Sequence, residues 1–164
     1  MRAHLSFPNP VNEKAARVVA AVVCVLSVVT LATGAYWLAA VLAYGFVARV
    51  LAGPTFSPLG QAATRIVAPR LGPPKHVPGP PKRFAQAIGA TVTVSVALLA
   101  LAAHTDTPAD VLLGLMNLAS ALESVFAYCI GCELFALLMR AGVIPQSVCA
   151  ECANVGLRRA SAAG

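Results

Sequence analysis

Four of the five cysteines stand near the C-terminal end of the chain, in two pairs with the spacing C-x-x-C. The first pair is Cys129 and Cys132, and the second is Cys149 and Cys152. In a helix, a spacing of three residues puts both sulfurs on one side, close enough to form a disulfide after a modest adjustment. Thiol pairs of this kind exchange disulfides or carry sulfur, so all four are candidate catalytic residues.

The same spacing is also typical of a structural zinc site with four thiolate ligands. The two pairs, separated by residues 133–148, would then tie the C-terminal segment onto the preceding helix. Because the first pair lies in an apolar run, burying a doubly negative zinc–thiolate centre there would be costly. We therefore favour thiol chemistry without a cofactor. Zn²⁺ bound by the four cysteines, and cysteines with a purely structural role, remain as alternatives.

The reactivity of the first pair depends on where the helix around it begins. In one continuous helix Cys129 and Cys132 would lie late, where the helix dipole disfavours a thiolate. The carboxylate of Glu133 would oppose the thiolate further. A bend at Gly131 that started a new helix near Cys132 would reverse the effect of the dipole.

Charged and polar residues elsewhere could support this chemistry. Glu123 stands in an apolar run, as either a catalytic acid or a structural residue that hydrogen-bonds to Asn117 across helices. Arg49, Lys82 and Arg83 would favour a nearby thiolate or anionic sulfur species if the fold brings them close.

The composition excludes an ordinary soluble domain. Of 164 residues, 59% are hydrophobic and only 11% are charged, which is too little polar surface for a chain of this size in water. The net charge of +6 comes from basic residues between apolar runs. That position is typical of membrane topology, so we expect the charge to face the lipid bilayer and not nucleic acid.

The apolar runs predict an all-α integral membrane bundle of four helices in a single domain over residues 1–164. The expected parts are helices at 15–33, 36–51, 84–103 and 109–140, a Pro/Gly-rich loop at 53–82, and a Cys-containing tail at 141–164. Residues 61–67 could form a short surface helix within that loop. The fourth helix is longer than a bilayer core of about 30 Å requires, so it must tilt, bend or project.

The basic residues also predict an orientation. They lie before the first helix, in the 53–82 loop and after the fourth helix, whereas the short connections carry none. By the positive-inside rule, both termini and the loop are cytoplasmic. Both C-x-x-C pairs then lie near the cytoplasmic face, where a reducing thiol pool disfavours a static disulfide.

Several blocks of the sequence are similar to a known family. The blocks are residues 13–17, 53–58, 79–89, 122–123 and 128–133, the last reading Tyr-Cys-Ile-Gly-Cys-Glu. Through them the chain resembles a family of bacterial integral membrane proteins catalogued as domain of unknown function 4395. The resemblance covers about 12–152. It implies a multi-pass, four-helix protein of the bacterial inner membrane with a C-x-x-C as its working part. It also implies an association with thioredoxin-like and sulfur-transfer proteins. At position 133, where the family often has a basic residue, this chain has Glu133.

These observations lead to one main hypothesis. Cys129 and Cys132 exchange disulfide or transfer sulfur with a soluble thioredoxin- or rhodanese-like partner at the cytoplasmic face, as an oxidoreductase or sulfur relay. Cys149 and Cys152 act as a resolving or relay pair. The alternatives are the zinc-bound structural module and a small transporter or scaffold subunit. Gly- and Ala-rich helix faces would also allow a homodimer.

Overall fold

The structure, a computed structural model, describes residues 7–149. The described chain is helical apart from one pair of two-residue strands. Its elements are β1 (Val11–Asn12), α1 (Glu13–Thr33), α2 (Trp37–Ala52), α3 (Pro58–Ala62), α4 (Ala68–Arg70), β2 (His76–Val77), α5 (Gly79–Ala97), α6 (Asp106–Phe126) and α7 (Ile130–Arg140). Gly53–Thr55 and Gln146–Val148 form 3₁₀ turns, Ala63–Val67 joins α3 to α4 as a π turn, and Leu98–Ala102 extends α5 as another.

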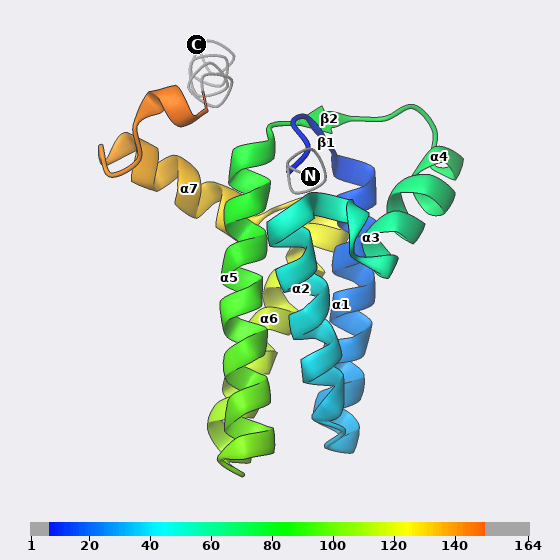
Figure 1. The fold of residues 1–164 in the computed structure, drawn as a ribbon, viewed down its shortest axis with the longest axis vertical. Coiled ribbons are helices and arrows are strands. Elements are labelled where there is room, and N and C mark those ends of the chain that lie inside the picture. The colour runs from blue at the N-terminus through cyan, green and yellow to red at the C-terminus, as the bar shows by residue number, and fades with distance from the viewer. Residues whose placement is uncertain (1–6, 150–164) are drawn as a thin grey trace.

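Four long helices form the predicted bundle (Figure 1). α1 packs along α6, and α2 packs along α5. Small residues allow the close approach: at Gly89 of α5, even a methyl group would collide with the ring of Phe46 in α2. α5 begins at Gly79, earlier than the predicted residue 84, because Pro80 and Pro81 occupy the first turn, where a missing N–H costs little.

The outer surface of the bundle is apolar. The four spans Glu13–Thr33, Trp37–Thr55, Gly79–Ala102 and Asp106–Phe126 are each long and apolar enough to cross a bilayer. Large apolar side chains such as Leu98 and Leu115 are each 60% exposed, an exposure that lipid tolerates and water would not favour. The chain is therefore a multi-pass membrane protein.

Short elements cover one end of the bundle. α3, α4, α7 and the antiparallel β1–β2 pair all lie at that end (Figure 1). The predicted surface helix at 61–67 is confirmed, but it is part of a longer helical stretch from α3 to α4. An ion pair of 2.8 Å between Lys75 and Glu13 ties the loop to the start of α1. At the opposite end, Tyr36 donates a hydrogen bond of 2.8 Å to the Asp110 carboxylate.

The fourth helix differs from the prediction. A continuous helix over 109–140 was expected, but α6 ends at Phe126 and α7 begins only at Ile130. The backbone turns at Ala127, which adopts the left-handed conformation with φ 57°. α7 then points away from the bundle axis (Figure 1). The expected bend at Gly131 is wrong, because Gly131 lies inside α7.

Candidate thiol site

A half-buried arginine explains why α6 ends where it does. Arg17 Nε and Nη2 donate to the carbonyl oxygen of Ser124 at 3.1 and 3.0 Å, and Nη2 also donates to that of Val125 at 3.0 Å. The last carbonyls of a helix have no partner within the helix and favour a positive charge. Arg17 supplies both the hydrogen bonds and the charge. The chain is then free to turn at Ala127.

The turn places the first C-x-x-C pair at the beginning of a helix. Cys129 is the residue before α7, and its carbonyl accepts from the backbone N–H groups of Cys132 and Glu133, each at 3.1 Å. The dipole of a helix stabilises negative charge at this end. The dipole of α7 therefore favours a thiolate at Cys129, in contrast to its expected effect in a continuous helix.

The two thiols are free and unlike each other. A hydrogen bond from the Cys132 thiol lowers the pKa of Cys129, and the ammonium of Lys82 lowers it further, against the opposing effects of burial and Glu123. The pKa of Cys132 is raised, because it donates to the Cys129 sulfur and because it is buried. Of the two sulfurs, Cys129 is thus the one whose thiolate is stabilised.

The cation beside the pair is held by Glu123. Lys82 Nζ lies 2.6 Å from Glu123 Oε1, and the two side chains are 8% and 17% exposed. The expected hydrogen bond between Glu123 and Asn117 is wrong. Asn117 instead accepts a hydrogen bond from the Cys24 thiol, at 3.1 Å. Glu123 therefore positions Lys82, and Lys82 acts on Cys129.

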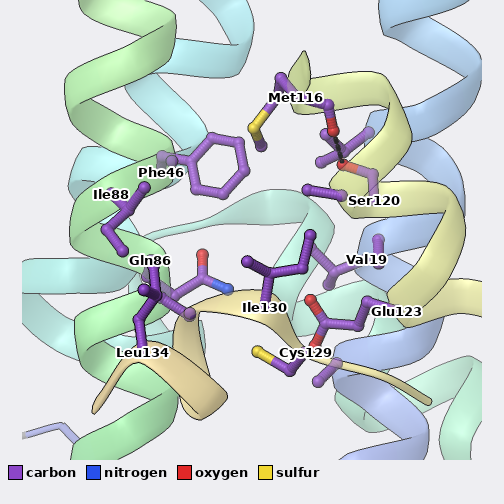
Figure 2. Close-up of a pocket in the computed structure, with 17 residues that line it drawn as sticks. Val19, Phe46, Gln86, Ile88, Met116, Ser120, Glu123, Cys129, Ile130 and Leu134 are labelled. Atoms are coloured by element: carbon purple, nitrogen blue, oxygen red, sulfur yellow. Dashed lines mark hydrogen bonds between the residues drawn. The ribbon is translucent and has the colours of Figure 1, made fainter. Parts of the chain in front are cut away.

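Cys129 faces a cavity inside the bundle. Figure 2 shows its sulfur near Glu123 and Ile130, below Val19 and Ser120. The cavity has a volume of about 110 Å³, and its lining is apolar except for Gln86, Ser120, Glu123 and Cys129. Cys129 is only 8% exposed and lines this cavity, so its sulfur is directed to the cavity more than to the outer surface.

Close contact between α5 and α7 fixes the position of the pair. A methyl group on Gly131 would lie 2.6 Å from the Cα of Ala85, closer than real side chains approach. α5 and α7 also touch through the rings of Phe84 and Phe135, which pack edge to face with 5.6 Å between their centroids. The sequence position that we expected to bend the helix is instead where two helices touch.

The predicted basic residues lie in three different places. Lys82 is at the thiol pair. Arg49 is buried and donates to Gln86 Oε1 at 2.8 Å and to Ser57 Oγ at 3.2 Å. Arg83 is exposed and donates to the carbonyl of Val50 at 3.0 Å, at the end of α2. Of the three cations, only Lys82 acts on Cys129.

Cys149 of the second pair is not part of this cluster. Cys149 is buried against Phe135 and Met139 and is disulfide-bonded, contrary to the expectation of reduced thiols. Cys152 lies outside the described residues. Within residues 7–149, no group of three or more His, Cys, Asp or Glu side chains is arranged to hold a metal ion. The four-thiolate zinc site, which also needs Cys152, stays a prediction.

Sequence reasoning missed two residues of the site. Arg17 ends α6, and Gln86 binds Arg49 and lines the cavity beside Cys129. Both are polar residues inside apolar runs that cross the membrane. In lipid such residues are rare and face the protein interior, so their position was a signal that could have identified them.

Replacing Arg17 with glutamine should loosen the turn before the thiol pair. Glutamine lacks the charge and reaches fewer carbonyls, so we expect a loss of about 1.5–3 kcal/mol in the free energy of unfolding. Denaturant unfolding in detergent measures this loss, with Arg65→Gln on the exposed helical stretch Ala63–Val67 as the control. An equal effect of the two substitutions would contradict the capping role of Arg17.

Fold and site together define a class: a multi-pass α-helical membrane protein with a free thiol pair at the start of a helix, at one end of its bundle. The family model described as "Domain of unknown function (DUF4395)" matches residues 11–140. The chain therefore belongs to this family, and the expected resemblance is confirmed. No curated protein and no solved structure matches the chain.

Proposed function

We propose that the protein exchanges disulfides through Cys129 and Cys132 with a soluble thioredoxin- or rhodanese-like partner. The observation that carries the proposal is the position of Cys129 before α7, where the Cys132 thiol and Lys82 stabilise its thiolate. A low-pKa thiol followed by a protonated second thiol is the arrangement that disulfide exchange requires. Transfer of a sulfane sulfur atom would use the same nucleophile.

The exchange has two steps. The Cys129 thiolate attacks one sulfur of the partner's disulfide, and the partner's other sulfur leaves as a thiolate and takes up a proton. The charge at Cys129 is then gone, so Cys132 loses its proton more easily. The Cys132 thiolate attacks the Cys129 sulfur and releases the partner as a dithiol. Two electrons pass to the partner, and a Cys129–Cys132 disulfide remains.

We assign the thiol end of the bundle to the cytoplasmic face of the bacterial inner membrane. Basic residues such as Lys14, Arg65 and Arg70 gather at this end, whereas Asp106 and Asp110 are at the other. The positive-inside rule then supports cytoplasmic termini. Because Cys129 is nearly buried, contact with a protein partner requires the segment around Ala127 to open. The Cys149 disulfide is a store of oxidising equivalents for a relay.

Trapping a mixed disulfide tests the proposal. The Cys132→Ser variant keeps the nucleophile and a hydrogen-bond donor but cannot resolve the intermediate, so it should accumulate a covalent complex with an oxidised thioredoxin-like protein. The Cys129→Ser variant should form none. Both variants are made in a chain that also carries Cys24→Ser, Cys149→Ser and Cys152→Ser, and complexes are read by non-reducing electrophoresis and mass spectrometry.

The two variants differ only in which sulfur remains, so each is the control for the other. Equal trapping by both, or a complex that forms through Cys132 alone, would overturn the assignment of Cys129 as the nucleophile. Absence of any complex with thioredoxin-like and rhodanese-like proteins would overturn the proposed exchange.

A further inference from the structure

A second cavity lies at the loop end of the bundle and is larger than the one at Cys129. It has a volume of about 330 Å³ and is enclosed by the segment before α1, the end of α2, the α3 region and the start of α5. Its polar lining comes from Asn12, Arg49, Thr64, His76, Lys82 and Gln86. The thiol chemistry proposed above does not use this space.

The two cations in this lining are buried but unequally compensated. Arg49 and Lys82 are both buried. Lys82 has an ion pair with Glu123, whereas the hydrogen-bond partners of Arg49 are the neutral Gln86 and Ser57. Within the part of the chain that the structure describes, no carboxylate forms an ion pair with Arg49. One carboxylate therefore serves two buried positive charges.

A buried guanidinium without an anionic partner is costly, and an anion in the adjoining cavity would offset that cost. The ring of Phe46 contributes some compensation, since the Arg49 guanidinium carbon lies 4.5 Å from its centroid. A cation–π contact does not replace a counterion. Around Arg49, the cavity lining also offers neutral donors in Asn12, Thr64 and Gln86.

We propose that this second cavity binds a small oxyanion, with Arg49 as its main partner. A guanidinium binds sulfate-like and phosphate-like groups through two parallel hydrogen bonds, which suits a fixed and buried arginine. The oxyanion is either a free one, such as a sulfur oxyanion, or the phosphate of an anionic lipid headgroup at the membrane face. Ala16, Val19 and Gln86 line both cavities, so the oxyanion site adjoins the cavity of Cys129.

Equilibrium binding of radiolabelled sulfate tests the site directly. The full chain is used in a neutral detergent, with chloride holding the ionic strength constant. We expect saturable binding of one sulfate per chain. The exposed Thr64 lines the cavity, so Thr64→Asp adds a negative charge there without disturbing the core. We expect this variant to bind at least about tenfold more weakly, because like charges repel at short range.

The matched control is Arg65→Gln, which makes the same change in net charge next to Thr64 but lines neither cavity. Its affinity should stay close to that of the unchanged chain. Arg49→Lys keeps the charge, loses the paired donors and should weaken binding. Absence of saturable binding, or an equal loss in Thr64→Asp and Arg65→Gln, would overturn the proposal.

A second experiment, in lipid vesicles, identifies the source of the oxyanion. Sulfate binding is repeated in vesicles of phosphatidylcholine and of phosphatidylglycerol. Loss of sulfate binding in phosphatidylglycerol alone supports a lipid phosphate as occupant, and equal binding in both supports a free oxyanion. A chain with Cys129→Ser and Cys132→Ser should retain the binding, so failure of disulfide exchange and failure of anion binding are separate results.

Discussion

Replacing Lys82 with methionine should lower the free energy of unfolding by about 3 kcal/mol or more, because it leaves the Glu123 carboxylate in the protein interior without its ion-pair partner. Methionine fills a similar volume, so the loss of packing is small. The unfolding of the purified chain in detergent, followed by denaturant titration, measures the effect. The short Lys82–Glu123 contact and the low exposure of both side chains are the reasons for expecting so large a change.

The same substitution should slow the reaction of Cys129. The positive charge of Lys82 lowers the pKa of the Cys129 thiol, so its removal raises that pKa and leaves less thiolate at neutral pH. We expect the midpoint of the pH–rate profile for alkylation to move upward. Peptide mass spectrometry after timed iodoacetamide treatment reads Cys129 separately from the other cysteines.

A double variant separates the two effects. Lys82→Met with Glu123→Leu removes both charges and should recover most of the lost stability, since no unpaired carboxylate remains. The alkylation midpoint should return only partway, because neither the helpful ammonium nor the opposing carboxylate is present. A single variant as stable as the unchanged chain, with an unmoved midpoint, would show that Lys82 does not act on the thiol.

The general architecture could be predicted from the sequence because apolar length decides it. The runs around Val19, Leu42 and Val96 are about as long as a bilayer is thick. In lipid a single run can satisfy its backbone hydrogen bonds only as a helix. The proline-rich connection between the second and third runs could also be predicted, because clustered prolines interrupt a long helix. The start of α5 was misplaced, because prolines that interrupt a helix can also occupy its first turn.

The break before α7 could not be predicted from local sequence. Ala127 is a good helix former, and its left-handed conformation is unusual for a residue with a side chain. The cause lies more than a hundred residues away, in the hydrogen bonds from Arg17 to the end of α6. A contact so distant in sequence leaves no periodic pattern. Gly131, which looks locally like a hinge, is a packing residue.

For the thiol site, too, the residue types could be predicted from the sequence, whereas their arrangement could not. The residue types at Cys129, Cys132, Glu123 and Lys82 marked them as candidates because thiols and charges are rare in apolar helices. Their roles depended on geometry that the sequence does not contain. The helix dipole favours the thiolate only because α7 starts at Ile130, and Glu123 holds Lys82 only because α5 and α6 are adjacent.

Replacing Gly131 with alanine should displace α7 from α5. The added methyl group would meet the backbone of Ala85, which cannot move aside as a flexible side chain could. Overpacking of this kind costs about 1–3 kcal/mol, and here it acts on the helix that begins at the thiol pair. We therefore expect both a less stable protein and a changed alkylation rate at Cys129.

Gly114→Ala is the matched control, because a methyl group at that position of α6 meets nothing within 4 Å. There alanine should be neutral or stabilising by up to about 1 kcal/mol, because it replaces a glycine in a helix interior with open space for the methyl group. Combining Gly131→Ala with Ala85→Gly removes one of the two close contacts and leaves the Cα of residue 85 in place, so only part of the stability should return. If Gly131→Ala behaved like Gly114→Ala in unfolding and in alkylation, α7 would not be held against α5 at this point. The thiol pair would then owe its position to the turn at Ala127 alone.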